Sequence, residues 1–460
     1  MSQEILLNNN ELLSKTNEKE ENNNFIKRRC MLNLKRRCKD RLAVIVFFTL
    51  YLFLLVAPLA KIILMDKTPM EKIANFIFPR FFIRSFLIYG ILLVFYIVMS
   101  IWFISELVVL SFLLGIANVI FTIYLFVKYK LHFTVIIAPS LLLLCFLGYY
   151  AFYRKTLELS LKTFRCSAAI LKHYIPGMIL VSVLGAVMFI PLYLMMVVIS
   201  SDIQQNKFNT VLVIMLLIYI TWYMSVLKSF IDCYISSLIF YRIYGAKNVG
   251  MEAFKTAVMS VGTCAIAGFI EMLFNLLRSF IKNKTSSSSW FTSGILTIFL
   301  KWLLNGAMDL IMVFMDIYHK FVIGFTSLHN TNYLDGAKLT YKNISNFKGY
   351  PLANYLTYGL ILRGMEFVGI TIMALTIMYD IIFNGIIQTV TKNLKGEAED
   401  VEVLVAKVIQ IPLAPISGFA IARFIYQKLF SGSMAVLLLY CVDRETLNLQ
   451  FPDFAMEKEI

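Results

Sequence analysis

Five acidic residues of this sequence fall inside apolar segments, where an ionised side chain is costly unless a partner, water or ligand offsets its burial. They are Asp232, Glu271, Asp309, Asp316 and Glu366. Each indicates either a structural ion pair or a site that receives a cation. The spacing to basic residues in the same segment helps to separate these two interpretations, because side chains three or four residues apart meet on one helix face.

Two of these acids have a basic residue at helical spacing, and two do not. Lys228 lies four residues before Asp232, and Arg363 three residues before Glu366, so both acids can be neutralised on their own helix. Asp232 is therefore a weaker candidate for binding. Glu271 and Asp309 have no basic residue within one turn. We expect these two to supply the negative charge of a cation site. A permanent ion pair with a basic residue of another helix would contradict this expectation.

Three aromatic residues, Tyr219, Trp222 and Tyr223, fall within little more than one helical turn. The faces of such rings attract a quaternary ammonium ion, which cannot donate hydrogen bonds. The alternative is a structural role, because Tyr and Trp are common in helix packing and at bilayer interfaces. With an acid nearby, the three rings are candidates for the wall of an organic-cation site.

Catalytic and cofactor-binding motifs do not occur in this sequence. The four histidines form no His-x-x-x-His pair, and no phosphate-binding G-x-x-x-x-G-K-[ST] loop is found. The seven cysteines lack metal-ligand spacing. We therefore expect neither an enzyme nor a cofactor or metal site.

The elements that carry these residues are apolar segments long enough to cross a bilayer, which takes roughly 20 residues. The 460 residues are 59% hydrophobic and only 15% charged. We predict an all-α, polytopic membrane protein with about ten transmembrane helices. The candidate spans are 42–64, 82–104, 106–127, 132–153, 176–199, 209–240, 256–280, 292–318, 354–380 and 403–430.

This map divides the chain into four parts. Residues 1–40 form an Asn-rich and then basic tail, predicted to be disordered and drawn to anionic inner-leaflet lipid. Residues 41–200 hold the first five helices and 201–442 the second five, with a cytosolic loop at 319–350 that contains a surface helix at NYLDGAKLTYKNI. Residues 443–460 form a short cytosolic tail.

The placement of charge predicts the orientation. Basic residues gather in the N-terminal tail and in alternate loops, which puts both termini in the cytosol. This pattern has no continuous basic face, so the formal charge of +15 does not indicate nucleic-acid binding. Asn283 of Asn283-Lys284-Thr285 falls in a Ser-rich loop outside and is a predicted glycosylation site, whereas Asn343 falls inside and should stay unmodified.

The small residues Gly262, Ala265, Ala267 and Gly268 share the seventh expected span. Small residues let two membrane helices approach closely. They therefore predict a packing face on this span.

The second half, about residues 209–460, resembles the choline transporter-like family, especially its fungal branch of pH-nine-sensitive proteins. The similar segments are TWYMSVLKSF with Trp222 and Lys228, Gly262-Thr263 with Arg278, HKFV at 319–322, the 333–341 helix, and LLLYCVDRETLNLQFPDF at 437–454. Asp232 stands where that family usually has His. The resemblance implies a ten-span plasma-membrane carrier of choline or a related amine.

Together these observations favour a secondary or facilitative carrier of a small organic cation across the plasma membrane. Glu271, Asp309 and Asp232 would supply charge, and Tyr219, Trp222 and Tyr223 an aromatic wall. Two alternatives remain. One is a channel, and the other is a non-transporting multi-pass scaffold or lipid-interacting protein.

Overall fold

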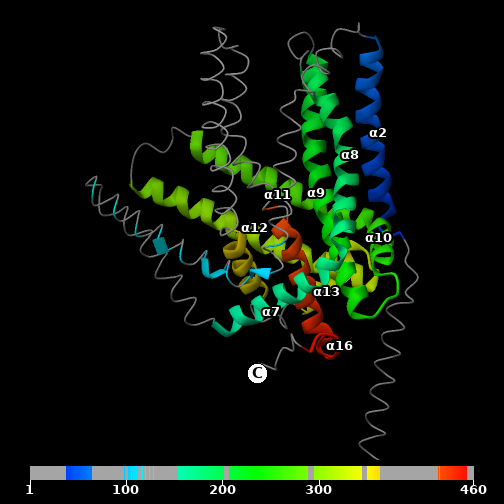
Figure 1. The fold of residues 1–460 in the computed structure, drawn as a ribbon. Helices are drawn as coiled ribbons and strands as arrows, with labels where there is room; N and C mark the ends of the chain where they lie inside the picture. Colours follow the sequence, from blue (N-terminus) through cyan, green and yellow to red (C-terminus); the bar gives the residue numbers. More distant parts are fainter. Residues whose placement is uncertain are drawn as a thin grey trace, which may run out of the picture. The chain divides into compact units, whose positions relative to one another are not determined.

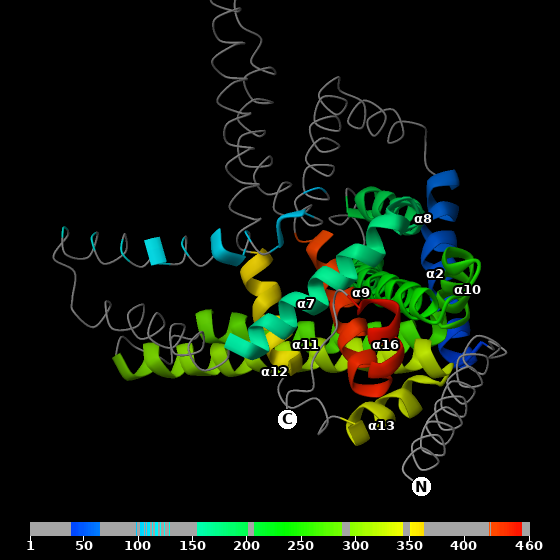
Figure 2. The same ribbon diagram turned by 60° about the horizontal axis from the view of Figure 1, so that its bottom comes forward.

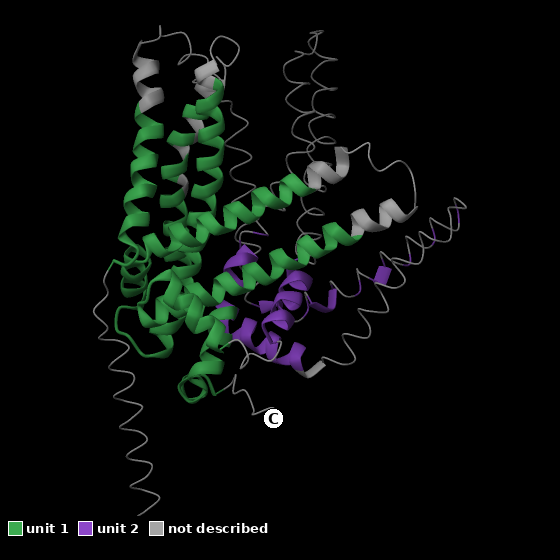
Figure 3. Cartoon of the chain, turned by 180° about the vertical axis from the view of Figure 1, so that it is seen from behind, with its two compact units in different colours: residues 1–66, 170–348, 434–460 green, residues 67–169, 349–433 purple. Residues whose placement is uncertain are grey.

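In the computed structural model, the regular elements of the described residues are helices, which confirms an all-α fold for that part of the chain (Figures 1 and 2). The described residues are 38–64, single positions between 98 and 128, 154–200, 207–287, 295–343, 350–362, 423 and 425–452. The chain divides into two compact units, which Figure 3 colours separately. Unit 1 comprises 1–66, 170–348 and 434–460, and unit 2 comprises 67–169 and 349–433.

Unit 1 is built around one long helix, α9. Its helices are α2 (Arg41–Leu64), η1 (Lys172–Tyr174), α8 (Ile175–Ser200), α9 (Lys207–Ile243), α10 (Val249–Met259), α11 (Val261–Ser287), α12 (Ile295–His329), α13 (Tyr333–Asn343) and α16 (Arg444–Gln450). α9 contacts α8, α10, α11, α12 and α16. α2, α8 and α9 run side by side, whereas α11 and α12 form a pair inclined steeply to them (Figure 1).

The sequence of α9 explains its central position. Its 37 residues make a helix about 55 Å long, more than the roughly 30 Å of hydrocarbon in a bilayer. The C-terminal half is surrounded by protein, with Ile235, Leu238 and Ile239 fully buried. The helix ends before Gly245, whose positive φ of 75° is readily adopted only without a Cβ. The following residues therefore turn back toward α10.

Asp40 joins three helices of unit 1. Its carboxylate accepts hydrogen bonds from the Thr263 hydroxyl (2.7 Å) in the first turn of α11 and from the Tyr333 backbone N–H (3.1 Å) at the start of α13. Asp40 itself has a left-handed φ of 52° and precedes α2. Gly262 lies so close that an added Cβ would come 2.7 Å from the carbonyl oxygen of Lys39. The start of α2 is thus fixed against α11 and α13.

Two further helix ends follow from side-chain chemistry. α12 ends at His329 because Asn330 adopts a left-handed φ of 52°, a conformation that Asn tolerates. The Asn332 side chain accepts from the Asp335 N–H at 2.7 Å and so caps α13. Asp443 caps α16 and also accepts a 3.1 Å hydrogen bond from Tyr244, just after α9.

Hydrogen-bonded polar side chains and stacked rings lie in the core of the described part of unit 2. It contains residues 154–169 of α7 (Arg154–Leu171), the helix at 350–362, and residues 425–433. The Thr163 hydroxyl donates to Asn354 (3.0 Å), and the Asn354 amide donates to the Ser433 hydroxyl (3.2 Å). Phe430 stacks on Tyr358 with ring centroids 4.6 Å apart. Polar pairing and ring stacking thus hold three separate segments together.

Five helices of the described residues are long and apolar enough to cross a membrane. They are Thr156–Phe189, Thr210–Ile243, Val261–Ile281, Leu303–His329 and Ile425–Val442, and the shorter apolar helix Arg41–Val56 matches the first expected span. The span expected at 209–240 corresponds closely to α9, whereas α11 begins five residues and ends seven residues later than the span expected at 256–280. The prediction of a multi-pass helical protein is confirmed to that extent, and the count of about ten stays a prediction.

Further boundaries differ from the expected ones. Residues 154–171, assigned to a loop because of their basic residues, form the helix α7. α12 continues to His329 instead of ending at 318, so only the later part of the expected 319–350 loop follows it, with the surface helix confirmed as α13. The last described apolar helix ends at Val442 rather than 430. Asn283 lies within α11 and not in a loop.

Several predictions fall outside the described residues. These include the spans at 82–104 and 106–127 apart from single positions, the span at 132–153, most of 354–380 and of 403–430, the Arg363–Glu366 pair and the tail before residue 38.

Candidate functional site

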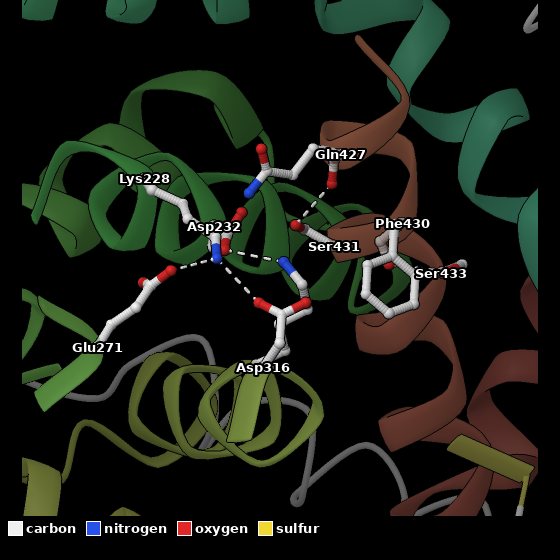
Figure 4. Close-up of polar contacts among 9 residues, drawn as sticks. Lys228, Asp232, Glu271, Asp316, Gln427, Phe430, Ser431 and Ser433 are labelled. Atoms are coloured by element: carbon white, nitrogen blue, oxygen red, sulfur yellow. Dashed lines mark hydrogen bonds and ion pairs between the residues drawn. The ribbon is translucent and has the colours of Figure 1, made fainter. Parts of the chain in front are cut away.

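Lys228 of α9 connects α11 and α12 through two carboxylates. Its ammonium group donates a 2.6 Å hydrogen bond to Glu271 of α11 and a 2.9 Å hydrogen bond to Asp316 of α12 (Figure 4). We call Lys228, Glu271 and Asp316 the charged triad. Because its members come from three helices, the triad forms only when α9, α11 and α12 are packed together.

A second ion pair lies next to the triad. Lys320 of α12 donates a 2.9 Å hydrogen bond to Asp232 of α9. Asp232 is one turn beyond Lys228, and Lys320 one turn beyond Asp316, so the two interactions occupy successive turns of the same two helices. The spacing predicted that Lys228 and Asp232 would pair within their helix, whereas the hydrogen bonds above run between helices.

The triad and the Lys320–Asp232 pair differ in the exposed fraction of their side chains. The side chains of the Lys320–Asp232 pair are 3% and 4% exposed. Those of the triad remain 25% (Lys228), 18% (Glu271) and 26% (Asp316) exposed. The pair is therefore sealed by protein, whereas a part of each side chain of the triad is left uncovered.

The charges of the two interactions also differ. The sealed pair has one positive and one negative group and is neutral. The triad has two carboxylates for one ammonium group, so it carries one net negative charge when all three groups are ionised. The uncompensated negative charge thus lies in the accessible part of the network, where a cation is favoured electrostatically.

A third ion pair extends the contact between α11 and α12. Arg278 of α11 pairs with Asp309 of α12. Arg278 is seven residues after Glu271, and Asp309 seven residues before Asp316, so in antiparallel helices both contacts lie on one face. Two turns, about 10 Å, separate them along the helices. The Arg278–Asp309 pair is more exposed, at 36% and 48%, and lies apart from the triad.

His319 and Tyr333 attach α13 to the same part of α12. The Tyr333 hydroxyl and His319 Nδ1 are 2.9 Å apart, and both side chains are buried. Burial raises the pKa of the Tyr333 hydroxyl, and the neighbouring Tyr318 raises it further, so the phenol stays protonated at neutral pH. The polar groups around Asp316 therefore continue through His319 to the start of α13.

The three aromatic candidates are brought together, but at another level of α9. Trp222 precedes Lys228 by six residues, or about 9 Å of helix. Its indole N–H donates to the Ala265 carbonyl of α11 (3.0 Å). The hydroxyl groups of Tyr219 and Tyr223 donate to the carbonyls of Phe47 in α2 (3.0 Å) and Gly185 in α8 (2.8 Å).

Phe47 covers the same three rings. It stacks on Tyr219 and Tyr223 with centroids 5.7 and 6.1 Å apart, and meets Trp222 edge to face at 5.2 Å. All three candidates are buried. In this conformation the aromatic group therefore holds α2, α8, α9 and α11 together.

The small residues of α11 make the expected packing face. Ala265 and Ala267 are buried, and a Cβ added to Gly268 would lie 2.6 Å from the backbone nitrogen of Val226 in α9. This close approach brings α11 near enough for Lys228 to reach Glu271. The expectation of a packing face is confirmed.

The candidates from the sequence are thus distributed over several environments. Glu271 belongs to the triad, Asp232 to the sealed pair, and Asp309 to the pair with Arg278. Neither Glu271 nor Asp309 has a basic partner on its own helix; both receive one from another helix. Asp316 and Lys320 were not selected as site residues. The seven-residue spacing of Glu271 with Arg278, and of Asp309 with Asp316, could have indicated that these charged residues share one face of each helix. Within the described residues no group of three or more His, Cys, Asp or Glu side chains could hold a metal ion.

Five long apolar helices, with a charged network where three helices cross, define a multi-pass helical membrane protein. The sequence matches the family described as plasma-membrane choline transporter over residues 137–445, and the chain belongs to this family. Membership indicates a membrane transporter. The match confirms the resemblance and begins earlier than the residue 209 at which the resemblance was noticed. A search of the curated proteins gave no match.

Proposed function

We propose that this protein is a secondary or facilitative carrier that moves a small organic cation, choline or a related amine, across the plasma membrane. The charged triad of Lys228, Glu271 and Asp316 is the proposed cation site. The family supports a small solute such as choline. The triad supports the sign of its charge.

One observation carries this proposal: a single ammonium group is shared by two carboxylates in a part of the bundle that remains accessible. A cation is attracted by the net negative charge of the triad, whereas an anion would meet two carboxylates. Glu271 is the most direct candidate because it lies on α11, in contact with both α9 and α12. Asp232 and Asp309 are assigned supporting roles, because each pairs with a basic residue outside the triad.

The sequence-based hypothesis of an aromatic wall also stays a proposal. A solute could reach the ring faces of Tyr219 and Tyr223 only after Phe47 moves away, because Phe47 stacks on both. Phe269 of α11 is exposed and meets Trp222 edge to face at 5.6 Å, so its ring is more accessible than those of the three candidates. It lies two residues before Glu271, which directs the two side chains to different sides of α11. We therefore assign Phe269 to the aromatic group and not to the triad.

Uptake into proteoliposomes tests the carrier proposal. Purified protein is reconstituted, and uptake of labelled choline and labelled ethanolamine is compared with uptake into protein-free liposomes. We expect saturable uptake by the wild type. Glu271→Gln removes the net negative charge of the triad without changing the shape of the side chain, and should raise the apparent KM about tenfold or more.

The matched control is Asp335→Asn, which removes an exposed carboxylate from α13. It should transport like the wild type. Equal uptake by the wild type and Glu271→Gln would remove the triad as the cation site. No uptake of either amine by the wild type would remove the carrier proposal and leave the scaffold or lipid-interacting alternative, and current beyond a carrier's turnover would favour a channel.

The finer topology also belongs to this proposal. We propose about ten spans with both termini in the cytosol, a basic segment before α2 that binds anionic inner-leaflet lipid, and an outside position for Asn283. In eukaryotic cells, Asn283→Gln should then remove a glycosidase-sensitive band shift, and Asn343→Gln should change nothing. A shift that depends on Asn343 would reverse the orientation. The narrower resemblance to the fungal pH-nine-sensitive proteins stays a prediction.

A further inference from the structure

The ammonium group of Lys228 stands where a transported cation would bind, between Glu271 and Asp316. We propose that Lys228 is an internal substitute for the cation: it withdraws when the solute binds, and it returns to the carboxylates so that the unloaded carrier can reorient. This inference rests on the proposed function, because it concerns the same site. It goes further because it assigns a specific role to Lys228. With this residue the carrier can return empty and so perform net transport, and without it the carrier can only exchange one solute for another.

The geometry allows Lys228 to move without the backbone. Its two hydrogen bonds, 2.6 Å to Glu271 and 2.9 Å to Asp316, are made by the tip of a flexible four-carbon stem. The side chain is 25% exposed, so protein does not enclose it on every side. Lys320, the other lysine of the network, is 3% exposed and is held by Asp232. Of these two lysines, Lys228 is therefore the candidate for leaving its partners.

Charge determines what each state of the site can do. With Lys228 in place, the empty triad carries one net negative charge, and the two carboxylates carry the same net charge after a monovalent cation has replaced the withdrawn ammonium group. Without Lys228, the empty site has two negative charges and the loaded site has one. The cost of taking charge out of water rises with the square of the charge, so the doubly charged empty site is the unfavourable state. A carrier lacking Lys228 should therefore change sides only when it is loaded.

Two consequences distinguish this role from a purely structural one. First, Lys228→Met should bind the cation more tightly, because a competing ammonium group is gone and one more negative charge is left uncompensated. Second, Lys228→Met combined with Glu271→Gln leaves Asp316 as the only charged group of the triad. This double variant has the wild-type net charge of the empty site, so it should regain net transport although two members of the triad are missing.

The experiment compares two choline assays in proteoliposomes. In the first, uptake of labelled choline into vesicles without internal choline reports net transport. In the second, vesicles preloaded with unlabelled choline report exchange. For Lys228→Met we expect net uptake to fall about tenfold while exchange stays within about twofold of the wild type. The double variant should recover most of the net uptake, and Lys338→Met, at an exposed lysine of α13, should behave like the wild type in both assays.

The outcomes separate this inference from the carrier proposal. No choline uptake by the wild type in either assay contradicts the carrier proposal. Transport by the wild type, with net uptake and exchange lost in equal proportion by both the single and the double variant, contradicts the inference alone. Thermal unfolding of each variant is measured first. If Lys228→Met is too unstable to reconstitute, the double variant tests the inference by itself. Exchange without net uptake in the double variant would contradict the charge argument.

Discussion

The hydroxyl of Thr263 donates a 2.7 Å hydrogen bond to the carboxylate of Asp40, joining residues 223 positions apart in the sequence. The bond connects the first turn of α11 to the residue that precedes α2. The same oxygen of Asp40 accepts from the N–H of Tyr333, so one carboxylate positions three helix starts. Since α11 also carries Glu271, this junction helps to set the position of the charged triad.

Replacement of Asp40 tests this junction. Asp40→Ala should destabilise the protein by about 2 kcal/mol. It removes the acceptor of two hydrogen bonds, and alanine adopts the left-handed φ of this position less readily than Asp or Asn. Asp40→Asn keeps one acceptor oxygen and tolerates that φ, and should lose less than half as much. The measurement is thermal unfolding in detergent. Equal unfolding temperatures for Asp40→Ala and the wild type would contradict the junction.

Gly268 should be the glycine of α11 that determines its distance from α9. Gly268→Ala would place a Cβ 2.6 Å from the Val226 nitrogen, a backbone atom that cannot move independently, so we expect a loss of stability. Gly306→Ala in α12 is the control. Nothing lies within 4 Å of its Cβ, and Ala for Gly in a helix should gain about 1 kcal/mol. If Gly268→Ala and Gly306→Ala change the unfolding temperature in the same direction, the close approach of α11 to α9 at Gly268 does not limit stability.

The sealed pair should behave as a single unit. Asp232→Asn or Lys320→Met alone leaves a charged group buried beside a neutral one, which typically costs about 3–5 kcal/mol. The double variant removes both charges and should recover much of that loss. A double-mutant cycle of unfolding free energies measures the coupling. Additive losses would mean that the 2.9 Å contact contributes little.

The hydroxyl groups of the aromatic residues should affect stability more than transport. Tyr219→Phe and Tyr223→Phe keep the rings on Phe47 and remove one hydrogen bond each, so each should cost about 1 kcal/mol. In this conformation the rings are covered, and we expect the apparent KM for choline to change less than about twofold. A large KM increase with unchanged stability would instead indicate that the rings line the solute path.

Hydropathy predicted the apolar helices well because length and composition are local properties. α9 begins and ends close to the expected bounds, and α11 overlaps most of its expected span. α7 was missed because its basic residues were interpreted as a loop between spans. The spacing of Leu157, Ser160, Phe164 and Ser167, all buried, is that of one helix face and could have indicated an amphipathic helix. The extension of α12 to His329 depends on the conformation of Asn330, which the sequence does not determine.

The site was only partly predictable, and the reason is its dependence on several helices. Spacing rules detect partners on one helix, so they paired Lys228 with Asp232 and left Glu271 without a partner. The partners are determined by how α9 packs on α11 and α12. That packing depends on close contacts such as Gly268 with Val226. The charges were visible in the sequence, but their distribution between a sealed pair and an open triad was not.

The direct Arg278–Asp309 pair and the triad, in which Lys228 bridges α11 and α12, restrict how this hairpin can move. Glu271 and Arg278, like Asp309 and Asp316, are seven residues apart, so an axial slip of one helix past the other would misalign both interactions at once. Tilting the hairpin as a rigid body keeps Arg278 and Asp309 aligned, and it changes the contacts of α9 with the hairpin, including those of Lys228 and the Lys320–Asp232 pair. The common seven-residue spacing thus opposes sliding of α11 along α12. We expect access to the site to depend on the hinge between α9 and the hairpin.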